Sequence, residues 1–98
     1  MPRKPKGERK MYLEEYAEAI NQTLHWTYQH HRINHERRYT VNLRHSCVQG
    51  GGVERHLYGA GPTPETAKDD YVRKIRGQRL TFNNGSVKEF DVPSNLEG

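Results

Sequence analysis

The alternation of apolar and polar positions divides the chain into a helical start, a strand-rich middle, a second helix and a final hairpin. The first apolar stripe recurs at spacings of three and four residues, which predicts an amphipathic helix over about residues 11–24. Its members are Leu13, Tyr16, Ala17, Ile20 and Leu24. Residues 24–30 fit either a continuation of this helix or a strand, and their Trp, Thr and Tyr content favours the strand.

Residues 39–48 alternate in the manner of a strand that is buried on one face. One face carries Tyr39, Val41, Leu43, His45 and Cys47, and the other carries Thr40, Asn42, Arg44 and Ser46. We expect a charged loop at residues 31–38, a Gly-rich turn at residues 49–52 and a return strand at residues 53–58. Gly59 and Gly61 then form the turn that ends the return strand.

The clearest element is a second helix over about residues 64–76. Thr63 is a good N-cap because its hydroxyl accepts a hydrogen bond from an orphaned backbone N–H, and Pro64 fits the first helical position. Gly77 supplies the left-handed residue that ends many helices. The apolar face of this helix consists of Ala67, Tyr71, Val72 and Ile75.

A last hairpin is predicted at residues 79–83 and 87–92, because Asn84-Gly85 between them is a strong two-residue turn signal. Pro93 stops the pairing, and we expect residues 94–98 to fray. The element order is then α-(β)-β-β-α-β-β, in which the bracketed strand is residues 24–30. We predict an α+β fold with two helices on one face of an antiparallel sheet of four to five strands.

Length and charge limit the organisation of the chain. Its 98 residues form one domain at most, and a hydrophobic content of 32% leaves a thin core, so we expect a homodimer or a higher homo-oligomer. The net charge of +4 lies in residues 1–10, which hold five basic residues and one acid. We expect a disordered basic leader at 1–10 and a single domain at 11–93. The leader either adds phosphate affinity or only improves solubility, and both interpretations stay open.

Several function classes are excluded by what the sequence lacks. No apolar run approaches the length of a membrane span, so we expect a cytoplasmic protein with no membrane partner. The single cysteine, Cys47, is typical of a reducing compartment. His45 stands two residues before Cys47, but no nucleophile elbow, P-loop or acid pair accompanies them. We therefore expect no catalytic residues, no enzyme activity, and a buried apolar role for Cys47.

The six histidines raise the question of a metal site. His31 and His35 are four residues apart, His30 adjoins them, and His45 shares a predicted strand face with Cys47. Zinc needs nitrogen and sulfur ligands that converge tetrahedrally, and the chain has neither a Cys-x-x-Cys nor a His-Glu-x-x-His motif. We expect no metal and no cofactor.

The best candidate for a functional site is a cationic stretch with interleaved aromatic residues. Arginine binds phosphate through two parallel hydrogen bonds, and tyrosine and tryptophan stack on bases. The pattern predicts a site for a nucleotide, a nucleic acid or an acidic protein surface. Its members are Trp26, Tyr28, Arg32, Arg37, Arg38, Arg44, Arg55, His56 and Tyr58. An alternative also stays open, in which Trp26, Tyr39 and one or two tyrosines belong to the core and the arginines pair with Glu36 and Glu54.

Residues 59–93 resemble the C-terminal part of short phage-encoded accessory proteins. The shared run is Gly-x-Gly-x-Thr-Pro-Glu-x-Ala, followed by Asp-Tyr, Ile-x-Gly and a hairpin that closes on Val-Pro. This resemblance implies a small counter-defence protein in the cytoplasm of a host cell. Its partner would be a nucleotide, a nucleic acid or a host defence protein, which it sequesters or blocks without catalysis.

Residues 39–76 resemble the C-terminal half of a double-stranded-RNA-binding domain, in which Gly-x-Gly leads into a helix that carries Ala-Lys. Only Lys68 matches that family's phosphate-binding lysines, and Pro64 and Glu65 stand where the others would be. The helix start is also similar to that of HicB-type antitoxins. Both resemblances imply an alternative function as a nucleic-acid-binding regulator.

Overall fold

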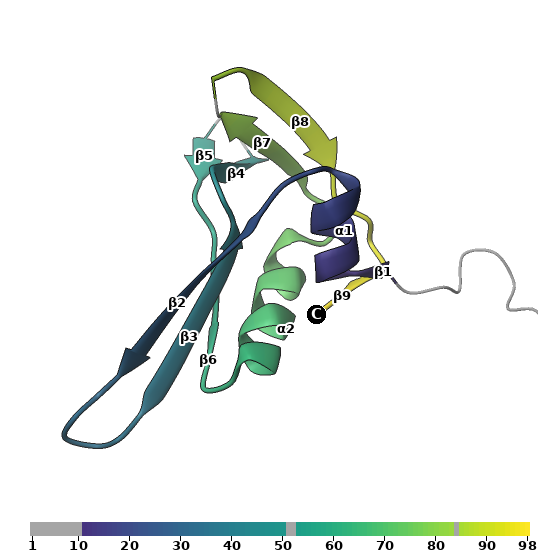
Figure 1. The fold of residues 1–98 in the computed structure, drawn as a ribbon. Coiled ribbons are helices and arrows are strands. Elements are labelled where there is room, and N and C mark those ends of the chain that lie inside the picture. The colour runs from purple at the N-terminus through teal and green to yellow at the C-terminus, as the bar shows by residue number, and fades with distance from the viewer. Residues whose placement is uncertain (1–10, 51–52, 84) are drawn as a thin grey trace, which may run out of the picture.

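The computed structural model describes residues 11–50, 53–83 and 85–98, so the predicted leader at 1–10 lies outside the described residues. Two helices are set among runs of consecutive strands in this part of the chain (Figure 1), and the predicted α+β class is confirmed. The helices are α1 (Leu13–Ala19) and α2 (Pro64–Ile75). The strands are β1 (Met11–Tyr12), β2 (Leu24–His30), β3 (Arg37–Leu43), β4 (Ser46–Gly50), β5 (Val53–Arg55), β6 (Gly59–Gly61), β7 (Arg79–Asn83), β8 (Val87–Asp91) and β9 (Leu96–Glu97).

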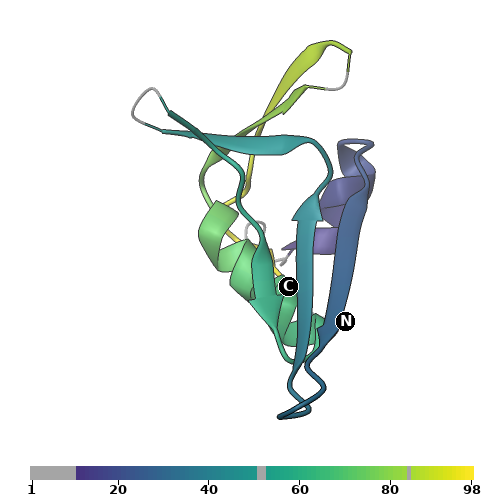
Figure 2. The same ribbon diagram turned by 90° about the vertical axis from the view of Figure 1, so that its left-hand side faces the viewer.

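The described strands form two antiparallel sheets and a short parallel pair, and the expectation of one sheet is wrong. One sheet has the order β2-β3-β6, the other has the order β5-β4-β7-β8, and β1 pairs with β9. Both helices lie on one side of the β2-β3-β6 sheet, and none of the described helices covers the other face of that sheet (Figure 2). The predicted arrangement of two helices on one face therefore holds for this sheet.

The chain passes from one sheet to the other at a bend between β3 and β4, within the predicted single strand at 39–48. His45 has a left-handed backbone with φ of 64°, so the alternation of side chains is interrupted there. His45 is consequently exposed instead of sharing the buried face of Leu43, and Ser46 is buried instead of exposed. Cys47 is buried, as predicted.

The predicted return strand at 53–58 is shorter than expected, because β5 ends at Arg55 and residues 56–58 connect it to β6. Gly59–Gly61 forms β6, an edge strand paired with β3, and is not a turn. Gly59 lies directly under α2, where a Cβ atom would overlap backbone atoms of Ala67 and Tyr71. The glycine therefore lets helix and strand approach closely. In the predicted turn at 49–52, the first two residues belong to β4, which ends at Gly50. The other two lie outside the described residues.

Helix α2 agrees with its prediction at both ends. The Thr63 hydroxyl accepts a hydrogen bond from the Thr66 N–H at 3.2 Å, and the Thr66 hydroxyl accepts one from the Thr63 N–H at 3.0 Å. Gly77 has the expected left-handed φ of 68°. The hairpin of β7 and β8 is confirmed as well, although Asn84 of its predicted turn lies outside the described residues.

Helix α1 is shorter than the predicted 11–24. The first two residues of the predicted range form β1 instead. After the helix, Asn21 adopts a left-handed backbone with φ of 56°, and Leu24 begins β2. The strand interpretation of 24–30 is thus confirmed. The expected loop at 31–38 ends at Glu36, because β3 begins at Arg37.

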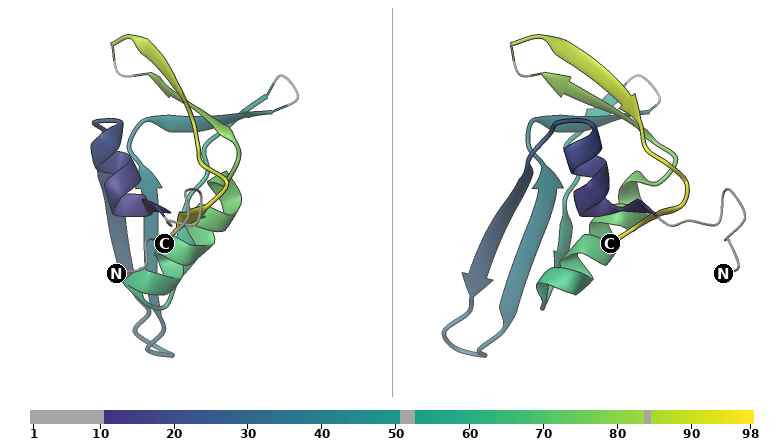
Figure 3. Two further views of the ribbon diagram at one scale, coloured as in Figure 1. Left: turned by 90° about the vertical axis from the view of Figure 1, so that its right-hand side faces the viewer. Right: turned by 45° about the vertical axis from the view of Figure 1, so that its right-hand side comes forward.

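The chain after Pro93 does not fray, contrary to the prediction. Leu96 is fully buried in β9, which lies beside β1 (Figure 3). Arg76 holds this segment, since its Nε donates to the Leu96 carbonyl at 2.6 Å and its Nη2 lies 2.9 Å from Glu97. Leu96 is therefore part of the hydrophobic core, and the segment after Pro93 is held in place by it.

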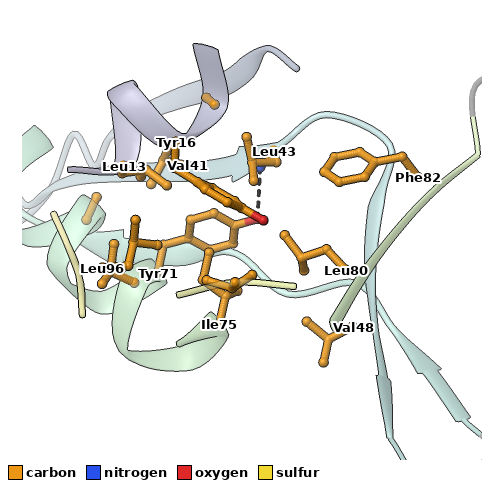
Figure 4. Close-up of a cluster of buried hydrophobic side chains, with 14 residues drawn as sticks. Leu13, Tyr16, Val41, Leu43, Val48, Tyr71, Ile75, Leu80, Phe82 and Leu96 are labelled. Atoms are coloured by element: carbon orange, nitrogen blue, oxygen red, sulfur yellow. Dashed lines mark hydrogen bonds between the residues drawn. The ribbon is translucent and has the colours of Figure 1, made fainter. Parts of the chain in front are cut away.

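The core lies between the helices and the two sheets, with Tyr71 of α2 near its centre (Figure 4). The Leu43 N–H donates to the Tyr71 hydroxyl at 2.9 Å, and the Ser46 hydroxyl donates to the Leu43 carbonyl at 2.6 Å. These side chains satisfy the backbone of Leu43 at the bend, where β3 has run beyond the end of β6.

Candidate ligand-binding groove

The uncovered face of the β2-β3-β6 sheet is polar. Side chains alternate along a strand, and Val41 and Leu43 of β3 face the core. The intervening positions of β3 and their partners in β2 therefore face away from the helices. These pairs are His25 with Asn42, Thr27 with Thr40, and Gln29 with Arg38.

A groove of about 400 Å³ crosses this face, between the β2-β3 hairpin and the segment that joins β5 to β6. It is lined by His25, Thr27, Gln29, Arg38, Thr40, Asn42, His56, Leu57 and Tyr58. None of these lining residues is acidic. Its volume falls within the range of about 300–1,000 Å³ that is typical of small-molecule sites.

Neighbouring side chains fix several of the lining groups. The Nη2 of Arg44 lies 3.2 Å from the Nδ1 of His25, and the hydroxyls of Thr27 and Thr40 contact each other. On the other side of the groove, the Nζ of Lys74 donates to the Tyr58 carbonyl at 3.0 Å and lies 5.7 Å from the centre of its ring. Helix α2 thus adds a positive charge beside the aromatic wall of the groove.

Asp70 connects this wall to α2. Its Oδ2 accepts a hydrogen bond from the Ala60 N–H at 2.9 Å and lies 3.0 Å from the Nζ of Lys74. Partial burial acts to raise the pKa of Asp70, but the Ala60 hydrogen bond and the charges of Lys74 and Arg73 outweigh it, so that the pKa lies below its usual value. The carboxylate form of Asp70 therefore holds β6 and the groove wall to the helix.

His56 is the histidine that lies beside Cys47. Its Nδ1 is 3.3 Å from the Cys47 Sγ, whereas His45, the neighbour considered from the sequence, lies at the exposed bend. This contact holds the His56 ring at the groove. Within the described residues, no three His, Cys, Asp or Glu side chains are grouped so that they could hold a metal ion.

The structure brings together three of the nine predicted site residues in the groove: Arg38, His56 and Tyr58. Arg44 joins them indirectly through His25. The other five lie elsewhere. Trp26, Tyr28 and Arg37 belong to the opposite face of the β2-β3 hairpin, Arg32 lies in its end loop, and Arg55 is exposed on β5.

The alternative interpretation of the aromatic residues is confirmed only in part. Tyr39 packs against the core, and its ring centre lies 4.7 Å from that of Tyr28. Trp26 is 38% exposed and does not belong to the buried core.

Sequence reasoning missed six lining residues of the groove. Five of them form two rows of polar side chains at alternate positions of adjacent strands, and the sixth, Leu57, lies between β5 and β6. The pattern was readable in residues 38–42, where Thr40 and Asn42 share a polar face with Arg38. Residues 24–30 had two open interpretations, so the second row, His25, Thr27 and Gln29, had no assigned face.

Lys68, the one residue that matches the phosphate-binding lysines of double-stranded-RNA-binding domains, forms an ion pair within the chain. The Nζ of Lys68 lies 2.6 Å from the Glu14 carboxylate of α1. This ion pair joins the two helices, and its lysine is thereby held next to an acid.

The helices described are too short and too polar to cross a lipid bilayer. No protein-family model, curated protein or solved structure matches this chain at the significance required for a relationship.

Proposed function

We propose that this protein binds a nucleotide in the groove of the β2-β3-β6 sheet and does not convert it. The observation that carries the proposal is the meeting of Arg38, two histidines and Tyr58 in one concave surface whose lining residues include no acid. Such a surface attracts an anion and offers a flat ring to a base.

The groups have complementary tasks in this proposal. Arg38 presents a planar fork of N–H donors that matches a phosphate, and Tyr58 offers the stacking surface. The hydroxyls of the threonine pair and the amides of Gln29 and Asn42 are donors and acceptors suited to ribose and base edges. The volume of the groove fits one nucleotide better than a folded partner.

The resemblance of residues 59–93 to phage accessory proteins supplies the context of the proposal. A protein that sequesters a nucleotide signal must bind it tightly and release it unchanged. Counter-defence by sequestration therefore agrees with a groove that offers binding groups, and we propose this role for the chain.

Titration of isotope-labelled protein with a panel of mono-, di-, tri- and cyclic nucleotides tests the proposal. Amide shifts should concentrate on Thr27, Thr40 and residues 56–58. Replacing Arg38 by alanine should weaken binding about 10- to 100-fold, because a hydrogen bond to a charged group contributes about 1.5–3 kcal/mol. Arg79→Ala is the matched control, since Arg79 is an exposed arginine paired with Asp91 outside the groove.

Two results would overturn the proposal. One is the absence of shifts at the groove with every nucleotide in the panel. The other is recovery of a chemically altered nucleotide after incubation, with Arg38→Ala abolishing the conversion, because the groove would then be an active site.

A second candidate is a nucleic-acid-binding regulator. It is favoured by the resemblance of residues 39–76 to double-stranded-RNA-binding domains, since β6 carries the Gly-x-Gly run, leads into α2 and lies in a sheet with both helices on one face. This candidate requires affinity for duplex RNA that falls steeply with salt, because each neutralised phosphate releases counterions. A groove that binds one nucleotide gives a shallow slope instead, so binding measured between about 50 and 300 mM salt separates the two.

A further inference from the structure

Strand β2 presents an open edge. It is one of the two outer strands of the sheet with the order β2-β3-β6, the other being the three-residue β6, and Figure 2 shows no described strand beside its outer side. The Arg44 N–H donates to the Thr23 carbonyl at 2.9 Å, and the His31 N–H donates to the Glu36 carbonyl at 2.8 Å. The odd-numbered residues of β2 therefore make the backbone hydrogen bonds to β3. The backbone N–H and C=O groups that point outward belong to the even-numbered residues, Leu24, Trp26, Tyr28 and His30.

This edge lacks the devices that usually prevent strands from pairing with other chains. Its seven residues include no lysine, arginine, aspartate, glutamate or proline. The two outer strands of the second sheet differ from it, since β8 carries Lys88, Glu89 and Asp91 and the three-residue β5 carries Glu54 and Arg55. Charges on an edge strand oppose pairing, so the contrast marks β2 as the edge that is suited to a partner.

We propose that β2 pairs antiparallel with β2 of a second copy of this chain, about a two-fold axis at Thr27. In this register Thr27 faces the partner's Thr27, Trp26 faces the partner's Tyr28, and Leu24 faces the partner's His30. The outward backbone groups then form about eight hydrogen bonds, because hydrogen-bonded pairs exchange two each. The pairing joins the two three-stranded sheets into one sheet.

The side chains favour the same register. Trp26 and Tyr28, both substantially exposed in one chain, become cross-strand neighbours on the helix-bearing face. Continuing the register beyond β2 places the partner's His31 opposite Thr23, and the partner's Arg32 near the end of α1. Helix α1 carries Glu18 in its last turn and no basic residue there. A basic loop meets an acidic helix end on each side of the two-fold axis.

The dimer gives the two grooves a common face. A two-fold axis perpendicular to the sheet leaves both polar surfaces on the same side, with Gln29 of one chain opposite the partner's His25. This inference does not depend on the identity of a ligand, because the contacts that define it are backbone groups and the aromatic pair.

Cysteine cross-linking tests the register. In a Cys47→Ser background, Thr27→Cys should form an intermolecular disulfide under mild oxidation, because Cα atoms of a non-hydrogen-bonded antiparallel pair are about 4.5 Å apart and disulfides span about 4.4–6.8 Å. His25→Cys alone should not cross-link. A mixture of His25→Cys with Gln29→Cys should do so. Equal cross-linking of all single variants, or none at Thr27→Cys, would overturn the register.

Light scattering on the unmodified chain and on variants with opposite charges at position 27 tests the dimer itself. The unmodified chain should give twice the 11.5 kDa of one chain. Thr27→Lys and Thr27→Asp should each give monomers, because like charges directly opposite repel, and an equal mixture of the two should restore a dimer. Thr40→Lys is the matched control, one strand away from the axis on the same face, and should stay dimeric. A monomeric unmodified chain at high concentration would disprove the proposal, whatever the groove binds.

Discussion

The backbone N–H of Leu43 donates to the hydroxyl of Tyr71, 28 positions later in the chain, at a distance of 2.9 Å. Leu43 is the last residue of β3, and its N–H points to the side on which β6 has already ended. A helix residue thus supplies the acceptor that a neighbouring strand would otherwise provide. Burial raises the pKa of Tyr71 above its ordinary value, so the hydroxyl stays protonated over the physiological range.

Removal of this hydroxyl should therefore be costly. We expect Tyr71→Phe to lower the free energy of unfolding by about 1–3 kcal/mol, because the buried N–H of Leu43 loses its acceptor. Urea denaturation monitored by circular dichroism measures the change. Tyr28→Phe, at a half-exposed tyrosine on β2, should change stability by less than about 0.5 kcal/mol. Equal effects of the two variants would show that the hydrogen bond contributes no stability.

The contact between β6 and α2 should tolerate no side chain at Gly59. Gly59→Ala places a Cβ against backbone atoms of α2, which cannot rotate away, so we expect a loss of at least about 1–3 kcal/mol. Gly77→Ala faces open space and suffers only from its left-handed φ, for which about 1 kcal/mol is expected. Thermal unfolding should rank the two variants in this order, and the reverse ranking would contradict the close packing at Gly59.

The helix cap can be tested separately from the groove. Thr63→Ala should cost about 1 kcal/mol, because the Thr66 N–H loses its acceptor. For a domain of this size the melting temperature should fall by roughly 4–8 °C. Nucleotide affinity per folded molecule should stay constant, since Thr63 does not line the groove. If Thr63→Ala abolished binding while the melting temperature held, residues 59–63 would form a binding loop.

Acid should weaken the attachment of β6 to α2. The folded state lowers the pKa of Asp70, so this carboxylate stabilises the fold fully above its unfolded pKa of about 3.9, and the stabilisation is lost as the pH falls through the folded pKa. Asp70→Asn should reduce stability at pH 7 and should make the decline below about pH 4 shallower. Asp69→Asn, at an exposed position of the same helix, is the control. An unchanged acid profile in Asp70→Asn would contradict this role.

The elements predicted best are those that local chemistry specifies. The cap at Thr63, the left-handed Gly77 and the hairpin around Gly85 each depend on neighbours within a few residues, and the structure agrees with them. Fold class followed from the same signals. Arg38, His56 and Tyr58 were identified because arginine and aromatic residues are conspicuous in a polar chain.

The bend at His45 was not predictable in this way. The alternation through residues 39–48 is regular, and nothing local marks a histidine for a positive φ. The division into two sheets depends on distant groups, namely the Tyr71 hydroxyl at Leu43 and the pairing of β4 with β7. The groove could not be predicted for the same reason, because its walls come from segments on both sides of the bend. Leu96 was missed for a related reason, since burial of a single apolar residue leaves no periodic pattern.

The pairing of Met11 with Leu96 has a consequence for the order in which the chain folds. Contacts between residues this far apart form late, because the intervening chain must first be ordered. During synthesis the core around Leu13 has to wait until Leu96 has left the ribosome before it can close. Until then, the apolar side chains that pack against Leu96 in the core stay exposed, so the rate of this last step sets how long that surface is open to contacts with other chains.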